Sequence, residues 1–212
     1  MKKWIICIAC LFAGMAGTSA QESVNWSIKV GAGMTSWMGS KAEGKSALLN
    51  PKIEVGMDIP LNGLVSFQTG LAWASKGAHY KVNNRKIKVN QNYFQVPMLA
   101  AFHLGTDSDF DLVLTGGIYA AYGAHGKSET KLGDDLQLTW NTFEGATVEG
   151  TGLPTLGRIN DVNRFDTGLQ AGMSFDFSEY FIGVDGEFGL TRIAGSGSPR
   201  NLGIYLVVGY KF

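Results

Sequence analysis

Cysteine is almost missing from this sequence: of its 212 residues only Cys7 and Cys10 are cysteines. Long apolar runs are missing as well, because no later stretch approaches the roughly 20 apolar residues that a transmembrane helix needs. If the chain crosses a membrane, it is therefore expected to do so with strands. Proline is scarce, at 5 residues, which argues against a disordered chain.

An excess of charge of one sign is also missing. Lysine and arginine total 18, and aspartate and glutamate total 18, so the formal net charge is zero. A nucleic-acid partner normally requires a basic surplus. We therefore expect no nucleic-acid partner.

The N-terminus has the layout of a secretory signal peptide. Two lysines precede a short apolar run from Trp4 to Gly14, and small residues end in Thr18-Ser19-Ala20. We predict a signal peptide over residues 1–20 and one domain over residues 21–212. Cleavage of the signal peptide would remove both cysteines, so the mature chain would have no disulfide, no thiolate metal site and no cysteine nucleophile.

The last stretch, Asn201 to Phe212, alternates strictly between apolar and other residues, which is the period of a β-strand. One face carries only large apolar side chains and ends on Phe212. The same alternation recurs in seven earlier stretches. The eight predicted strands are residues 25–34, 52–59, 64–76, 93–104, 110–124, 164–177, 181–193 and 201–212.

The connections alternate between short and long. Short turns are predicted at 60–63, 106–109 and 178–180, and long loops at 35–48 and 77–92, among others. The longest connection, residues 125–163, has room for a small hairpin such as 136–140 with 146–148. Outer-membrane barrels have short periplasmic turns and longer external loops. The pattern predicts an all-β fold, an eight-stranded antiparallel up-and-down transmembrane β-barrel with both termini on the periplasmic side.

A soluble lipocalin-type barrel is the alternative architecture, since it shows the same alternation around an internal ligand. Its second face would meet water and carry many charges, whereas here that face is largely small and weakly polar, with 29 glycines in the chain. An eight-stranded barrel has a bore that side chains fill, which suits small residues. Aromatic residues are expected in two interfacial girdles near the barrel ends. We favour the membrane barrel, located in the cell outer membrane.

Several strands resemble the PorT-like eight-stranded outer-membrane barrels of Bacteroidetes. The resemblance is carried by Tyr93-Phe94-Gln95-Val96-Pro97-Met98-Leu99, Thr115-Gly116-Gly117-Ile118-Tyr119, Phe165-Asp166-Thr167-Gly168, Phe188-Gly189-Leu190-Thr191 and Gly209-Tyr210-Lys211-Phe212. Gln95 stands where that family usually has an acid, and the loop from His125 is long. The resemblance implies an outer-membrane location and, for the namesake of the family, involvement in secretion of other proteins.

Charged residues of both signs are predicted to face the interior. The predicted lumen polar network comprises Lys29, Lys52, Glu54, Asp58, Asp166, Asp176, Asp185 and Glu187, with Lys76 and Lys211 on the same face. Isolated buried charges are costly, so a hydrogen-bonded plug of ion pairs is the first interpretation. A narrow gated channel, opened when the pairs rearrange, is the alternative.

Catalytic chemistry finds little support. His79, His103 and His125 have no acid and nucleophile at suggestive spacing, and neither metal-ligand spacing nor a phosphate-binding loop is present. We predict no catalytic, metal or cofactor-binding residues. A barrel enzyme that modifies lipid is the less favoured alternative.

A structural, binding or secretion-associated role through the external loops is therefore the favoured function. The basic segment 81–88 and the acidic segment 129–135 are candidate contact regions. The expected partners are outer-membrane lipid and lipopolysaccharide, the barrel-insertion machinery during assembly, and a protein bound by the loops. Tyr210 and Phe212 are predicted to form the assembly signal.

Overall fold

The computed structural model describes residues 24–39, 46–82, 85–105, 110–132, 136–144, 162–195 and 198–212. The predicted signal peptide, residues 1–20, lies outside this part. The strands run β1 Asn25–Met38, β2 Leu48–Pro60, β3 Val65–Val82, β4 Arg85–Gly105, β5 Asp111–Leu132, β6 Leu136–Asn141, β7 Phe165–Phe177, β8 Tyr180–Gly189 and β9 Arg200–Lys211. No helix in the described part is long and apolar enough to cross a membrane.

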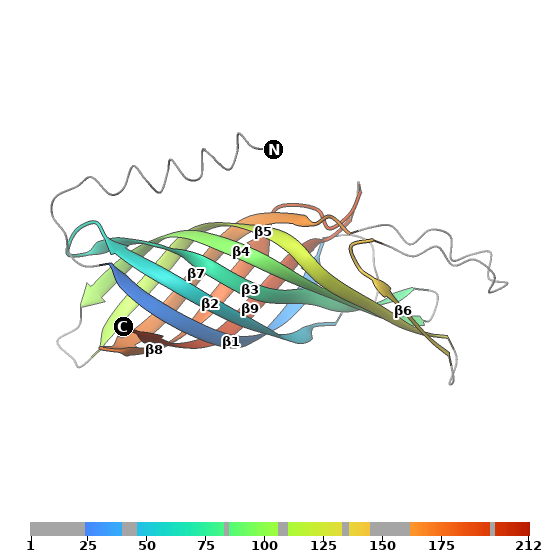
Figure 1. Cartoon of the computed structure of the whole chain (residues 1–212), viewed down its shortest axis with the longest axis horizontal. Helices are drawn as coiled ribbons and strands as arrows, with labels where there is room; N and C mark the ends of the chain where they lie inside the picture. Colours follow the sequence, from blue (N-terminus) through green and yellow to red (C-terminus); the bar gives the residue numbers. More distant parts are fainter. Residues whose placement is uncertain are drawn as a thin grey trace.

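Eight of these strands close into an antiparallel barrel (Figure 1). Each barrel strand pairs with the next along the chain, β5 pairs with β7, and β9 pairs with β1. The first and last strands share a long ladder in which Val30 lies opposite Val208 and Met38 lies opposite Arg200. The predicted fold class, with its up-and-down order, is thereby confirmed.

Alternation along the strands separates two faces, as the period of two requires. In β9 the side chains of Ile204, Leu206 and Val208 are exposed on the outer surface, whereas Tyr205 and Val207 are buried inside. The other barrel strands repeat this arrangement. The barrel therefore presents an apolar outer surface, and its buried side chains fill the lumen.

Aromatic side chains form a continuous row on the outer surface. Trp73, Phe94, Tyr122 and Phe165 lie directly opposite one another on β3, β4, β5 and β7, and each is more than one third exposed. Near the opposite end, which carries the C-terminus, Tyr180 and Tyr210 pack with ring centroids 5.1 Å apart. Two aromatic bands at the ends of an apolar belt are typical of a barrel in a bilayer.

Parts of the predicted loops prove to be strands, including residues 35–38 at the end of β1. Residues 77–82 and 85–92, predicted as part of a long loop, pair with each other as the outer ends of β3 and β4. Residues 125–132 extend β5, which pairs with β4 and with β6. The prediction was wrong because it judged strands by their apolar face, whereas these segments lie beyond the apolar belt and are held by backbone hydrogen bonds.

We call this extension the external sheet: the paired residues 77–82, 85–92, 125–132 and 136–141. It lies beyond the barrel end that is remote from the C-terminus (Figure 1). Of the hairpin suggested within 125–163, residues 136–140 do form a strand, but it pairs with β5. Residues 146–148 lie outside the described part. The described residues of this extension are therefore paired strands.

Proline within β4 coincides with a break in one ladder. The β3–β4 register runs through the pair Thr69–Met98 and resumes at Ala72–Gln95, so the pairing is interrupted beside Pro97. Proline has no N–H to contribute. Beside this break, the Thr69 hydroxyl donates to the Pro97 carbonyl oxygen at 2.8 Å. Pro97 is thus a local irregularity in a central strand.

Inward-facing glycines make room for large side chains in the narrow bore. A Cβ atom on Gly33 would lie 2.6 Å from both Cα and Cδ1 of Tyr205, which is fully buried. Gly116 is different, because a Cβ atom there would meet nothing within 4 Å. Gly33 therefore leaves the space that the buried Tyr205 ring occupies.

Substituting Gly33 with alanine is expected to lower the free energy of unfolding by about 1–3 kcal/mol, the usual cost of overpacking. Gly116→Ala is the matched control, and it should be neutral or slightly stabilising because the unfolded chain loses entropy. Urea unfolding of both variants in lipid vesicles measures the difference. Equal stabilities would contradict the packing role of Gly33.

Candidate functional site

Charged side chains of opposite sign meet across the lumen. The Nζ atom of Lys29 lies 3.2 Å from Glu54 Oε1 and 3.0 Å from Asp185 Oδ2. The Nζ atom of Lys52 lies 2.7 Å from Glu187 Oε1 and 3.6 Å from both Glu54 Oε2 and Asp185 Oδ2. The structure thus joins five residues of the predicted network, from β1, β2 and β8.

Lys76 of β3 extends this network. Its Nζ atom lies 2.9 Å from Glu187 Oε2 and 3.2 Å from Asp166 Oδ2. It also lies 3.9 Å from the centroid of the Tyr119 ring, a cation–π distance. Through Lys76 the sixth predicted residue, Asp166 of β7, joins the same network.

The central network contains four carboxylates and three lysines. Neutral side chains donate additional hydrogen bonds to one of the carboxylates, that of Asp166. Three side chains donate to Asp166: Tyr119 at 3.1 Å, Thr191 at 2.7 Å and Asn201 at 3.2 Å. A buried charge is costly unless it is paired and fully hydrogen-bonded. Hydroxyl and amide groups therefore supplement the contact of Asp166 with Lys76.

Neutral members of the network were missed by the sequence-based prediction. Gln95 donates to Glu187 at 2.7 Å and to Gln170 at 3.3 Å. Both glutamines are buried, as is Tyr119. The strand alternation could have identified these residues, because it places them on the inward face. Gln95, for example, lies between the outward-facing Phe94 and Val96. Charge alone was too narrow a criterion for this site.

The remaining two predicted acids lie in separate pairs toward the C-terminal end of the barrel. Asp176 forms an ion pair with Lys211. Asp58 accepts a hydrogen bond from Gln68 at 2.8 Å. The predicted group of eight is therefore divided between a central network of six and these two pairs.

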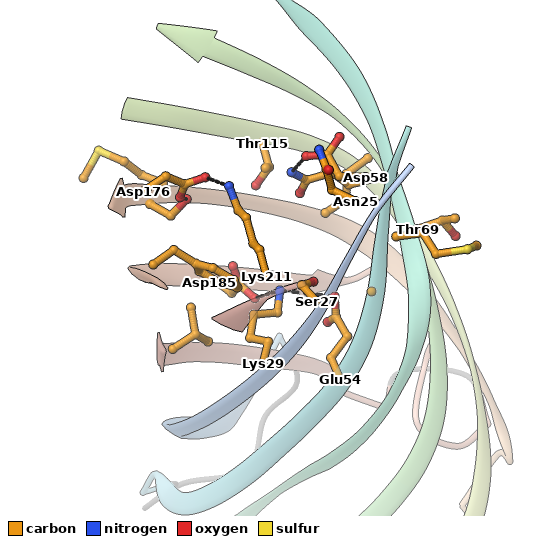
Figure 2. Close-up of a pocket in the computed structure, with 18 residues that line it drawn as sticks. Asn25, Ser27, Lys29, Glu54, Asp58, Thr69, Thr115, Asp176, Asp185 and Lys211 are labelled. Carbon is orange, nitrogen blue, oxygen red and sulfur yellow. Dashed lines mark hydrogen bonds and ion pairs between the residues drawn. The ribbon is translucent and has the colours of Figure 1, made fainter. Parts of the chain in front are cut away.

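A small polar cavity separates the two pairs from the central network (Figure 2). Its volume is about 60 Å³. Lys29, Glu54 and Asp185 point toward one another on one side of it, and the Asp176–Lys211 pair lies on the other. A polar space of this size holds a few water molecules.

Serine, histidine and aspartate do meet at the C-terminal end, which the spacing in the sequence did not suggest. Ser66 Oγ lies 2.7 Å from His103 Nε2, and Asp58 Oδ2 lies 3.6 Å from the same nitrogen. A catalytic triad requires the carboxylate on Nδ1 and the hydroxyl on Nε2. Because both groups contact Nε2, this arrangement does not orient a general base. Within the described residues, no group of three or more His, Cys, Asp or Glu side chains is placed to hold a metal ion.

The opposite end of the lumen holds an aromatic cap. Phe143, which follows β6, packs inside the barrel against Tyr93 with ring centroids 5.7 Å apart, and both are buried. A Cβ atom on Gly123 would lie 2.5 Å from Cε1 of Phe143, so the ring rests directly on that backbone. The Arg164 guanidinium lies 5.3 Å from the Phe143 ring centroid and donates to the Gly123 carbonyl oxygen.

The predicted assembly residues lie at the end of the closing strand. Phe212 exchanges two backbone hydrogen bonds with Trp26, at 2.9 and 3.3 Å, and its ring stacks on Tyr210 at 6.3 Å. The Phe212 side chain is 70% exposed. Its backbone thus contributes to the β1–β9 closure while its ring faces outward.

A closed antiparallel barrel with an apolar outer surface, aromatic bands and ion pairs in its lumen is an integral outer-membrane β-barrel. The comparison with known families agrees. Residues 19–195 match the model of the family described as the outer membrane protein beta-barrel domain, and the chain belongs to this family. It is an outer-membrane protein.

Solved structures of small barrels are similar in fold. The chain is similar to Ail, the attachment invasion locus protein of Yersinia pestis, whose structure contains the heparin analogue sucrose octasulfate: identity 16%, coverage 90% of this chain and 99% of Ail, TM-score 0.45. It is similar to Neisserial surface protein A, with 10% identity, coverage of 90% and 100%, and a TM-score of 0.47. It is also similar to OprG of Pseudomonas aeruginosa, with 11% identity, coverage of 88% and 95%, and a TM-score of 0.47. No curated protein sequence matches the chain.

Proposed function

We propose that this protein is a non-enzymatic structural, binding or secretion-associated component of the outer membrane that acts through its external region. The observation that carries the proposal is the external sheet, in which β3, β4 and β5 continue past the barrel and β6 pairs with β5. A surface made of paired strands is held in one shape before it meets a partner. Preorganisation of this kind lowers the entropic cost of binding.

The outward face of the external sheet is polar and carries both signs of charge. Lys88 and Thr139 lie opposite Glu129 on the two neighbouring strands. Glu129 Oε1 lies 2.7 Å from Lys127 Nζ, and this hydrogen bond lowers the pKa of the Glu129 carboxyl. Val89 and Ser128, on the other face, are buried. A mixed polar face on a rigid sheet suits a protein partner.

Transport through the lumen is the less supported function. Lys52, Lys76, Gln95 and Tyr205 are each no more than 2% exposed. A path for ions would have to displace this packed layer and break the ion pairs that join it. The filled lumen therefore supports an external role over a gated channel.

A non-enzymatic role is supported by the geometry at His103. Ser66 and Asp58 both contact Nε2 of His103, an arrangement that does not orient a general base. Modification of lipid would need an oriented general base near the bilayer surface. We therefore propose binding as the activity.

Within the family, we propose that the chain is a PorT-like barrel of Bacteroidetes type. The segment Tyr93 to Leu99 supports this, because its Pro97 is built into a central strand beside the interrupted β3–β4 ladder. Association with protein secretion is the part of the proposal that follows from this resemblance. Gln95, in place of the usual acid, here donates to Glu187.

Photo-crosslinking in intact cells tests the external role. A photoreactive amino acid at Lys88, Lys127 or Thr139 is expected to capture a specific protein, because these side chains lie on the outward face of the external sheet. Ile118, which is 48% exposed on the apolar belt, is the control position and should capture lipid alone. Recovery of nothing but lipopolysaccharide from all three test positions would rule out a protein partner at this face.

A further inference from the structure

The two ends of the lumen are built differently, and the outer end is closed by a side chain that the barrel wall does not supply. Phe143 lies 4% exposed against Tyr93, Tyr119 and Ala121, all of which point inward. Its neighbour Thr142 is held in place by hydrogen bonds to the carbonyl oxygens of Gly126 and Asn90, at 3.1 and 3.0 Å, and by contact with the hydroxyl of Ser128 at 2.8 Å. Phe143 is therefore fixed as a cap over the lumen.

An exposed ion pair fastens the same cap from outside. Arg164 Nη2 lies 3.3 Å from Oε1 of Glu144, the residue that follows Phe143. Nη1 of the same guanidinium donates to the Gly123 carbonyl oxygen at 3.1 Å. The guanidinium thus holds the barrel wall and the segment after β6 together.

The periplasmic end has no such cap among the described residues. The cavity of about 60 Å³ shares Asn25, Asp58 and Lys211 with a polar depression of about 360 Å³ at the mouth of the barrel, which Ser66 and His103 also line. The two spaces are therefore adjacent and share these three polar side chains. Figure 2 shows the Asp176–Lys211 pair apart from the group of Lys29, Glu54 and Asp185, and Lys211 lines both spaces.

We propose that water and small solutes enter the lumen from the periplasmic end only, as far as the Lys29–Glu54–Asp185 group, and that Phe143 seals the outer end. Between the two lies the packed layer that includes Lys52, Lys76 and Tyr205. The cavity is lined by the carboxylates of Glu54, Asp58, Asp176 and Asp185 against the ammonium groups of Lys29 and Lys211. Lys52 also lies 3.6 Å from Glu54 and Asp185, so four carboxylates stand against three ammonium groups, and this negative surplus favours cationic solutes. The inference concerns the lumen and does not depend on the proposed partner.

Single-cysteine reporters test this inference in the full chain with Cys7 and Cys10 changed to serine. Thr115 lines the cavity (Figure 2), and Ala121 lies under Phe143. The two residues face inward on β5 about 20 Å apart along the strand. Each is changed to cysteine, and the barrel is folded in lipid nanodiscs. A small cationic methanethiosulfonate is then added, and its rate of attachment is measured by mass spectrometry.

We expect Thr115→Cys to react at least about a hundredfold faster than Ala121→Cys, which must wait for local opening of the cap. Adding Phe143→Ala should accelerate the Ala121→Cys reaction at least about tenfold and leave the Thr115→Cys rate unchanged. Phe143→Leu, which keeps an apolar side chain of similar reach, should preserve the protection.

Three results would each overturn the inference. An unreactive Thr115→Cys shows that the cavity is closed to the periplasmic side. A reactive Ala121→Cys with Phe143 intact shows that the outer end is open. Protection of Ala121→Cys that persists in the Phe143→Ala variant shows that another group makes the seal. The first two comparisons need no change at Phe143, so the inference remains testable if Phe143→Ala fails to fold.

Discussion

Glu187→Ala is expected to lower the free energy of unfolding by about 3–5 kcal/mol, because removing one partner leaves buried charges without compensation. Glu187 serves two ammonium groups, with Lys52 at 2.7 Å and Lys76 at 2.9 Å. It also accepts a hydrogen bond from Gln95. Urea unfolding in lipid vesicles measures this loss of stability, with the folded fraction determined from the heat-modifiable gel mobility of the barrel.

Glu129→Ala is the matched control. Its carboxylate also lies 2.7 Å from a lysine, Lys127, but the pair is on the surface of the external sheet. A surface ion pair contributes less than about 1 kcal/mol. Similar losses for the two variants would show that burial of the network has no energetic consequence.

Deleting Phe212 is expected to remove most of the heat-modifiable barrel from the membrane fraction. The backbone of Phe212 closes the end of the β1–β9 ladder through Trp26, and its ring extends the aromatic group of Tyr180 and Tyr210. Phe212 is also the residue that the sequence predicts as part of the assembly signal. A charged tail added after Phe212 should have the same effect, because it places charge at the apolar boundary.

Phe177→Ala is a suitable comparison, since Phe177 is another exposed aromatic residue at the same end of the barrel. It lies within β7 and leaves the closing strand intact, so we expect it to assemble nearly normally. If the variant that lacks Phe212 gives normal amounts of folded barrel, Phe212 is not part of an assembly signal. Removal of residues from the external sheet should have a smaller effect on assembly than loss of Phe212.

The barrel strands could be predicted from the sequence because the bilayer imposes a strict rule on them. Outward positions within the apolar belt are predominantly apolar, so Ile204, Leu206 and Val208 mark β9 without ambiguity. The rule no longer applies beyond the belt. The lysines of residues 77–92 favour a loop, although the backbone groups of residues 77–82 and 85–90 pair with each other as regularly as those of the barrel.

The inward position of the charged residues also follows from the alternation, but their pairing does not. Lys29 and Glu54 lie opposite each other on adjacent strands, which the sequence order suggests. Lys52 and Glu187 are 135 residues apart and meet only because the barrel is closed. Phe143 gave no periodic signal at all, since it enters the lumen from the segment that follows β6. Contacts across the bore depend on tilt and register, which local patterns do not contain.

The contacts across the bore bear on the order of folding. Lys52 meets Glu187 and Lys76 meets Asp166 through strands that are far apart in the chain, so these pairs are unavailable to an open sheet. A slip of one residue at any ladder would turn the charges of that strand toward lipid. Partly closed intermediates would then carry unpaired lysines and carboxylates as well as free strand edges. We therefore expect closure and correct register to be reached in one cooperative step. Misaligned barrels are disfavoured because their lysines and carboxylates cannot form these ion pairs.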